Sequence, residues 1–255
     1  MIQSQRFQNI EKKALEKGIV NTKEMAELLG VTETTIRRDF EELERRGKII
    51  RVHGGAKGIR QKSVITMTDE LVIDQRTGHG AEKDAVCRKA ASFVQEGSCV
   101  FLDGGSSLVP MARYLKNREV RIVTNNLRLV SEMQDARAEV FFIGGTFIPK
   151  YSMNAGPIAI EEVARFNFDY SFISCLGLDL DRQLIYTAEL ETMAVKAAAM
   201  RVSSNSVLLL DASKLYVKAF CSLISMNAFD FMICNNDPSL NQENLPANFL
   251  LVDVD

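Results

Sequence analysis

The 255-residue sequence has only five cysteines, two histidines and no long apolar run. The cysteines are Cys87, Cys99, Cys175, Cys221 and Cys234. Their odd number and scattered spacing predict reduced thiols rather than a disulfide framework or a metal site. No run approaches the ~20 apolar residues that a membrane span needs. The first residues, MIQSQRFQNIEKKALEK, are too polar for a secretory signal, so we expect a cytoplasmic protein.

Charge is unevenly divided along the chain, although the net charge is only −2. Residues 1–60 carry 13 Lys and Arg against 9 Asp and Glu, and the remaining residues carry 18 against 24. A mildly basic head on an acidic body is typical of a nucleic-acid-binding module joined to a second domain. A solvated basic face would give the same count, so the prediction depends on the motifs in these residues.

Three helical patterns follow one another in the first 46 residues, and each has an apolar stripe at helical spacing. The stripes are Phe7, Ile10 and Ala14, then Met25, Leu28 and Leu29, then Ile36, Phe40 and Leu43. Asn21 and Thr32 are good N-caps for the second and third helices. Gly30 ends the second helix, and the turn of about three residues that follows predicts a helix-turn-helix.

The outward face of the third helix has the polarity of a DNA-recognition helix. Its residues are Thr34, Arg38, Glu41 and Arg45, with Thr35 and Arg37 beside them. Hydroxyl and guanidinium donors occupy the first turns, where such a helix enters the major groove, and acidic side chains come later.

A basic hairpin follows the third helix. The segment KIIRVHGGAKGIR predicts two strands joined at a His53-Gly54-Gly55 tip, and Arg51, His53, Lys57 and Arg60 could lie along a phosphate backbone. Two other interpretations stay open from the pattern alone. The segment could be a helical bundle with a solvated charged face, or a winged helix that docks on protein.

The stretch LLGVTETTIRRDFEELERRGKIIRVHGGA resembles the winged-helix signature of the DeoR family of bacterial transcriptional regulators. The TIRRD core and the RVHGGA wing are its most specific parts. The resemblance implies that Thr34, Thr35, Arg37 and Arg38 contact an operator. We therefore predict a winged helix-turn-helix DNA-binding domain over residues 1–57, with Arg51 and His53 of the wing also at the DNA.

Residues 58–80 have no sustained periodicity and are predicted to be a linker. From residue 81 to 255 the pattern alternates between helix and strand, beginning with an amphipathic helix over Glu82–Val94. Five short apolar strands are expected at Cys99–Leu102, Arg121–Thr124, Val140–Ile143, Tyr170–Ser174 and Val207–Leu210. This alternation predicts a mainly parallel sheet covered by helices on both faces.

Polar or glycine-rich segments follow several of these strands, at the edge where α/β sheets bind ligands. In VFLDGGSSLVPMA the first strand ends in a turn that is expected to open directly into a helix, whose first N–H groups could bind an anion. The residues predicted to bind an effector are Asp103, Gly104, Gly105, Ser106, Ser107, Thr124, Asn125, Gly144, Gly145 and Lys214. Glycines allow close approach, and Lys214 could neutralise a phosphate.

The segments FLDGGSS, IVTNNL, FIGG and LLLDASK resemble the sugar-phosphate-sensing domain of the DeoR family, whose Rossmann-like α/β fold is similar to that of ribose-5-phosphate isomerase. Arg76 and the Glu82-Lys83 pair also match the family. Its loop usually ends Gly-Thr-Thr, whereas this chain has Gly105-Ser106-Ser107. Tyr186–Met193 matches the family only loosely.

The remaining question is whether the pocket converts its ligand. Asp103, Glu189, Asp211 and Lys214 are candidate acids and bases. The two histidines lie in the wing and the linker, and no metal cluster or nucleophile–base pair is visible. An enzyme has no evident use for a winged helix, so we predict a sensor without cofactor, metal or catalytic residue. A sugar-phosphate isomerase or deaminase that also binds DNA is the alternative.

The predicted function is therefore transcriptional regulation, most simply repression of a carbohydrate-utilisation operon. Its partners would be operator DNA, a phosphorylated sugar or sugar alcohol, and further copies of the chain, with no membrane. One winged helix offers too few base contacts for operator-level specificity, which implies a dimer or tetramer.

Overall fold

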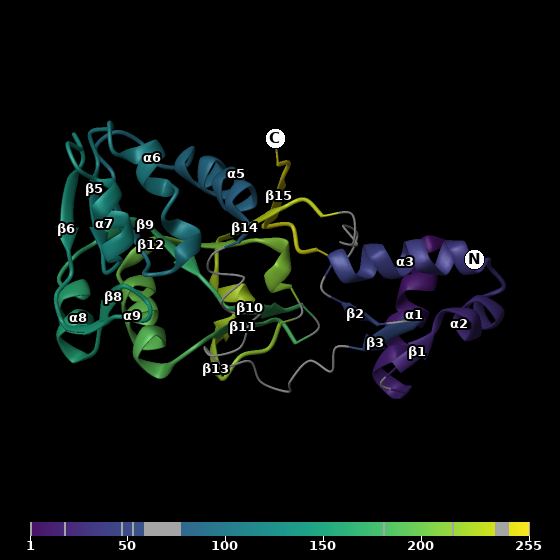
Figure 1. The fold of residues 1–255 in the computed structure, drawn as a ribbon. Coiled ribbons are helices and arrows are strands. Elements are labelled where there is room, and N and C mark those ends of the chain that lie inside the picture. Colours follow the sequence, from purple (N-terminus) through teal and green to yellow (C-terminus); the bar gives the residue numbers. More distant parts are fainter. Residues whose placement is uncertain are drawn as a thin grey trace. The chain divides into compact units, whose positions relative to one another are not determined.

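The computed structural model describes residues 2–17, 19–46, 48–52, 54–58, 78–180, 182–215, 217–237 and 245–254. The chain divides into two compact units, Met1–Ser63 and Val64–Asp255 (Figure 1). Most of the predicted linker, residues 59–77 with Arg60 and Arg76, lies outside the described residues. The domain boundaries 1–57, 58–80 and 81–255 therefore stay a prediction.

The first unit packs three helices against a small antiparallel sheet with strand order β1-β3-β2. Its elements are α1 (Gln3–Lys17), β1 (Ile19–Asn21), α2 (Thr22–Leu29), α3 (Glu33–Arg45), β2 (Ile49–Val52) and β3 (Gly55–Gly58). The sequence analysis did not anticipate β1, which consists of three residues. Val20 of β1 is buried and contributes to the same core as Ile10, Ile36 and Ile49.

The predicted caps are confirmed, and one core position is wrong. The side chain of Asn21 accepts a hydrogen bond from the N–H of Lys23, and that of Thr32 accepts one from Thr35. Leu28 was expected in the core, but its side chain is 56% exposed. The buried arc of α2 runs instead through Met25, Leu29 and Ala26, because these positions turn toward the core together at helical spacing.

The second unit is built on a seven-stranded sheet with order β15-β14-β12-β9-β4-β5-β6, in which every pairing is parallel. Its strands are β4 (Cys99–Leu102), β5 (Arg121–Thr124), β6 (Glu139–Phe142), β9 (Phe168–Ser174), β12 (Ser203–Leu210), β14 (Phe231–Asn235) and β15 (Phe249–Val252). All five predicted strands are present. The sequence analysis missed β14 and β15, which complete one side of the sheet.

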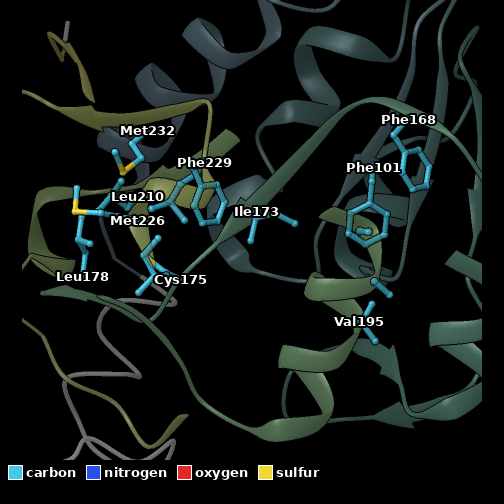
Figure 2. Packing of buried hydrophobic residues seen from close by; sticks show 14 of the residues in the cluster. Phe101, Phe168, Ile173, Cys175, Leu178, Val195, Leu210, Met226, Phe229 and Met232 are labelled. Carbon is cyan, nitrogen blue, oxygen red and sulfur yellow. The ribbon is translucent and has the colours of Figure 1, made fainter. Parts of the chain in front are cut away.

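Helices cover both faces of this sheet, as predicted. They are α5 (Gly80–Ala91), α6 (Met111–Leu115), α7 (Leu127–Glu132), α8 (Pro157–Val163) and α9 (Leu190–Arg201). Alternating strand residues enter two separate cores: Val100 and Leu102 pack with α5, α6 and α7, whereas Phe101 packs in the cluster that includes α8 and α9 (Figure 2). The central strand β4 is buried on both faces, and this explains why it is a continuous apolar run.

Two smaller sheets lie beyond the carboxyl ends of the main strands. One is the hairpin of β7 (Thr146–Ile148) and β8 (Met153–Ala155), and the other contains β10 (Gly177–Asp179), β11 (Leu184–Thr187) and β13 (Cys221–Ser225). Three short 3₁₀ turns complete the described elements: Ser106–Leu108, Ala212–Lys214 and Met226–Ala228.

The glycine loop after β4 does not open directly into a helix, contrary to the expectation. The loop enters the 3₁₀ turn Ser106–Leu108, and Pro110 then begins the five-residue α6. Neither element is long enough to align many peptide dipoles. The loop can therefore act through individual side chains and N–H groups, but not through a long helix N-terminus.

Candidate functional site

The first turns of α3 present the predicted polar residues at the surface of the first unit. Thr34, Arg37 and Arg38 are exposed, and Thr35 is half-buried with its hydroxyl 2.9 Å from that of Thr32. The guanidinium of Arg37 lies 3.3 Å from Glu33, one turn earlier. Arg38 has no ion-pair partner among the described residues, so its guanidinium is available to a ligand.

The aspartate of the TIRRD core holds the helix in place. Asp39 is 1% exposed, and both of its oxygens accept hydrogen bonds from the Arg6 guanidinium, at 2.7 and 3.0 Å. The hydrogen bond to Asp39 raises the pKa of Arg6. A bidentate pair of this kind fixes orientation as well as distance. It connects α1 to the inner side of α3 and leaves the outer side free.

The wing is tied to the later turns of the same helix. The Arg51 guanidinium lies 3.0 Å from Glu41, and the Arg51 N–H donates to Glu44 at 2.8 Å. The second tip glycine is needed for packing, because a Cβ on Gly55 would lie 2.1 Å from the carbonyl oxygen of Val20. His53 lies outside the described residues, and its role stays a prediction.

A hollow of the second unit lies at the carboxyl ends of β4, β9 and β12. The chain proceeds from β4 outward to β5 and β6, then returns to β9 on the other side of β4. This reversal is the switch point at which open α/β sheets bind ligands. The hollow has about 530 Å³ of empty space, part of it open to solvent. Four of the predicted effector-binding residues line it, namely Gly105, Ser106, Ser107 and Lys214, and their contact with an effector stays a prediction.

One side of the hollow is formed by a buried lysine that is close to a buried carboxylate. Lys214 is 4% exposed, and its ammonium donates to the Ser107 hydroxyl at 2.6 Å and lies 3.5 Å from Asp211. Burial acts to raise the pKa of Asp211, but Lys214, the Ser213 hydroxyl and nearby cations outweigh it, so that pKa is lowered. Asp211 therefore carries a negative charge that balances the ammonium.

A second buried lysine lies at the switch point, and the sequence analysis missed it. The Lys196 ammonium donates to the Asp103 carboxylate, to the Ser174 carbonyl at 3.0 Å and to the Ser174 hydroxyl at 3.2 Å. The same Asp103 oxygen accepts from the Ser174 N–H at 2.8 Å. Asp103 thus lies beneath the hollow, and Lys196 and Ser174 line it. A lone lysine in the apolar stretch AVKAAAM was the signal that could have revealed this role.

Five other predicted effector residues do not line the hollow. A Cβ on Gly104 would lie 2.5 Å from the sulfur of Met153. The Thr124 hydroxyl donates to the Leu102 carbonyl at 2.6 Å, and the Asn125 amide donates to Asn154 at 2.7 Å.

The remaining two glycines face α8. The Gly144 N–H donates to Glu162 at 2.7 Å, and Gly145 adopts a φ of +117°, with Ala159 close by. In this structure the five residues therefore shape the loops around the hollow, and their contact with an effector stays a prediction.

The mouth of the hollow is bordered by the β7–β8 hairpin and the start of α9. Tyr151 and Met153 come from the hairpin, and Thr187 and Thr192 come from β11 and α9. The Thr187 and Thr192 hydroxyls lie 3.3 Å apart. Lys150 bonds to Glu189 at the N-cap of α9, which connects the hairpin to the helix. Apart from Glu189, which the sequence analysis considered as a candidate acid or base, none of these residues was among the predicted site residues.

Family models cover both units of the chain. A DeoR-like helix-turn-helix domain matches residues 6–62, and a DeoR C-terminal sensor domain matches residues 78–236. The chain belongs to the DeoR family. The predicted fold class is confirmed: a winged helix-turn-helix domain is followed by an α/β domain with a parallel sheet. No helix among the described residues is long and apolar enough to cross a membrane.

Curated relatives match over nearly their full length. The regulator GlpR of Haloferax volcanii is 32% identical over 90% of this chain and 89% of its own. The lactose phosphotransferase system repressor of Staphylococcus aureus is 27% identical over 99% of this chain and all of its own.

Among solved structures, the ribose 5-phosphate isomerase of Plasmodium falciparum covers 53% of this chain and 52% of its own, with 15% identity and a TM-score of 0.39.

This DeoR-family protein is a DNA-binding transcriptional regulator. The two curated relatives named above are a repressor and a transcriptional regulator, which supports the regulator over the isomerase. Metal-binding groups of three or more His, Cys, Asp or Glu are absent from the described part of the chain.

Proposed function

We propose that the chain represses a carbohydrate-utilisation operon and releases its operator when a phosphorylated sugar or sugar alcohol binds. Residues 1–57 would bind DNA, residues 58–80 would connect the domains, and residues 81–255 would sense the effector. The names of the lactose phosphotransferase system repressor and of GlpR support a regulator of this class. The protein would act in the cytoplasm.

The operator contacts are proposed for Thr34, Thr35, Arg37 and Arg38 of α3, with Arg51 and His53 at the wing. Arg38 carries this assignment, because its exposed guanidinium has no described ion-pair partner and lies in the first turns of the helix. An arginine in this position can donate two hydrogen bonds to a guanine edge in the major groove. Two copies of the chain, as a dimer or within a tetramer, would bind two half-sites.

The effector's phosphate is proposed to bind at Lys214 and Ser107. One observation carries this assignment: the Lys214 ammonium makes one described hydrogen bond, to Ser107, and lies 3.5 Å from Asp211. An ammonium has three donors, so Lys214 retains donors for phosphate oxygens. Lys196 differs, because its three donors are used by Asp103 and Ser174. The hydroxyls of Thr187, Thr192 and Tyr151 would bind the sugar.

The DNA half of the proposal is tested by operator binding at one fixed salt concentration. Arg38→Ala is expected to weaken binding by about 1–3 kcal/mol with the fold intact. Arg128→Ala, which removes the same charge from an exposed position of the second unit, is the matched control and should bind as the wild type does. Equal affinity of the Arg38 variant and the control would remove the recognition-helix assignment.

The sensing half is tested by operator release against a panel of sugar phosphates and the same sugars without phosphate. We expect release by at least one phosphorylated compound and none by its unphosphorylated form. Each active compound should also raise the melting temperature of the protein, since it binds the native state. Release by an unphosphorylated sugar alone would contradict the assignment of Lys214.

A further inference from the structure

The two edges of the seven-stranded sheet differ in how they are covered. β15 and β6 are the outermost strands, and both are four residues long and largely apolar. The residues of β15 are buried or half-buried, whereas three of the four residues of β6 are exposed. Figure 1 shows β6 at the outer margin of its unit, beside α8. The sequence EVFF thus resembles an interior strand but occupies an open edge.

The backbone of β6 has hydrogen-bonding groups on its free side. The N–H groups of Glu139 and Ile143 donate toward β5, to Val120 and Thr124. Because successive residues of a strand alternate, the N–H and C=O groups of Val140 and Phe142 point away from β5. The free side ends at Gly144, whose N–H is already bonded to Glu162. Among the described residues, the N–H and C=O groups of these two positions of β6 therefore have no hydrogen-bond partner on that side.

The side chains at this edge are apolar on both faces of the sheet. Phe141 is 37% exposed and packs on Phe166, with ring centroids 5.6 Å apart. Phe142 is 41% exposed and, by alternation, lies on the opposite face. The two phenylalanines together expose about 150 Å² of apolar surface, from typical side-chain areas.

This area is about one fifth of the ~800 Å² that each partner buries in a standard interface, and it would lie at the apolar centre of one. The strand itself carries a single charge, on Glu139, which is paired with Arg121 at 3.1 Å. β6 lacks the features that usually protect an edge strand from pairing, which are lysine, proline and inward-pointing charge. The edge is therefore suited to another strand of the same apolar character.

We propose that β6 pairs antiparallel with β6 of a second copy across a twofold axis, joining two sheets into one of fourteen strands. The free groups fix the register: Val140 pairs with Phe142 of the partner subunit through two hydrogen bonds, and the symmetric pair adds two more. Phe141 then lies directly opposite the partner subunit's Phe141 in a non-hydrogen-bonded position. This inference rests on the proposed homo-oligomer and names the surface that forms it.

A second copy suits this edge better than an unrelated partner for two reasons. Two copies of a short strand with two free residues can satisfy each other's free groups when they run antiparallel. A twofold axis, the symmetry of an isologous dimer, produces this arrangement. The pairing also places an aromatic ring against an identical ring on one face and Phe142 against valine on the other. A twofold dimer agrees with the two half-sites that the proposed DNA reading needs.

Cross-linking of cysteine variants of the full-length protein tests the register. Facing residues of a non-hydrogen-bonded pair have Cα atoms about 4.5 Å apart, within disulfide range. Phe141→Cys should give a covalent dimer with copper–phenanthroline as oxidant. In Glu139→Cys, the matched control, the two sulfurs are about 13 Å apart along the strands and should give only the wild-type background from Cys99. Equal yields from both variants would overturn the register.

Sedimentation equilibrium tests whether this edge is the interface at all. Phe141→Lys sets two like charges opposite each other and should raise the dimer dissociation constant roughly 100-fold. Phe220→Lys, at a phenylalanine that is 67% exposed elsewhere in the unit, should leave it unchanged. Circular dichroism confirms that both variants are folded.

Failure of this inference can be separated from failure of the proposed function. A wild-type dimer that Phe141→Lys does not weaken and Phe141→Cys does not cross-link overturns the β6 interface, while operator release by sugar phosphates would still support the repressor. A wild-type monomer overturns the interface as well. If no sugar phosphate releases the operator but Phe141→Cys still forms the cross-link, the proposed effector is wrong and the β6 interface stands.

Discussion

Replacing Lys214 by methionine should lower the stability of the protein and its response to effector, and a second substitution should separate the two effects. Lys214 is 4% exposed and lies 3.5 Å from Asp211, which is 1% exposed. The substitution keeps the length of the side chain and removes its charge. Asp211 would then be a buried carboxylate without its principal neutralising partner.

The expected loss of stability follows from that burial. Removing one partner of a buried ion pair costs about 3–5 kcal/mol. The lower end applies here, because the Ser213 hydroxyl still donates to Asp211 and other cations lie nearby. About 3 kcal/mol lowers the melting temperature of a domain of this size by roughly 10 °C.

The loss should also depend on pH. The lowered pKa of Asp211 means that its ionised form stabilises the native protein above the ordinary value of 3.8, and this contribution is lost as pH falls through the lowered pKa. Burial raises the pKa of Asp211 and Lys214 lowers it, so the pKa rises when Lys214 is replaced. In the variant, Asp211 therefore becomes protonated at a higher pH and no longer buries an unbalanced charge. The loss in free energy of unfolding relative to wild type should be smaller at pH 4.5 than at pH 7.

The double variant Asp211→Asn with Lys214→Met removes both charges and should recover most of the lost stability, to within about 1 kcal/mol of wild type. It should not recover the response to effector. Both variants lack the ammonium, and a lost charge-assisted contact of about 2 kcal/mol corresponds to roughly 30-fold more effector for half-release of the operator.

Thermal unfolding and operator-release titrations of wild type, Lys214→Met and the double variant complete this test. If the double variant is as unstable as Lys214→Met, the ion pair is not the source of the loss. If it releases the operator at the wild-type effector concentration, Lys214 does not bind the phosphate.

Three further predictions concern other parts of the structure. Lys196→Met should cost about 3 kcal/mol in urea unfolding at pH 7 by leaving Asp103 buried and unpaired, and an unchanged midpoint would contradict the ion pair. Gly55→Ala should destabilise the first unit by about 2 kcal/mol, measured by its thermal transition, because the added Cβ meets the Val20 carbonyl at 2.1 Å. Ellman's reagent should label Cys99 before any other thiol, since the other four cysteines are buried; faster labelling elsewhere would refute this order.

Local patterns predicted the helices of the DNA-binding unit and the first strands of the sheet. The caps Asn21 and Thr32 act within three residues, and helical spacing alone brings Ile36 and Phe40 to one side. The strand Cys99–Leu102 has the predicted bounds because an apolar run followed by Asp-Gly-Gly marks its end in the sequence. Features of this kind need no knowledge of distant residues.

The floor of the hollow could not be predicted in the same way, because it depends on contacts between distant residues. Asp103 and Lys196 are 93 positions apart, and Ser174 lies between them in the sequence. They meet because β9 returns to lie beside β4, and no local pattern states that strand order. The glycine turns at Gly104 and Gly144 were attributed to ligand binding, yet each also accommodates a neighbouring side chain, Met153 or Glu162.

The arrangement of charges also suggests why this fold serves as a sensor here. A general base works best when its pKa lies near the working pH and its oxygen can accept a proton from the substrate. The Asp103 oxygen at the switch point already accepts from Lys196 and from two groups of Ser174, and the pKa of Asp211 is lowered away from neutrality. Each carboxylate thus serves to hold a lysine. A carboxylate that is held against a lysine is a poor general base at neutral pH, which agrees with a pocket that binds its ligand without converting it.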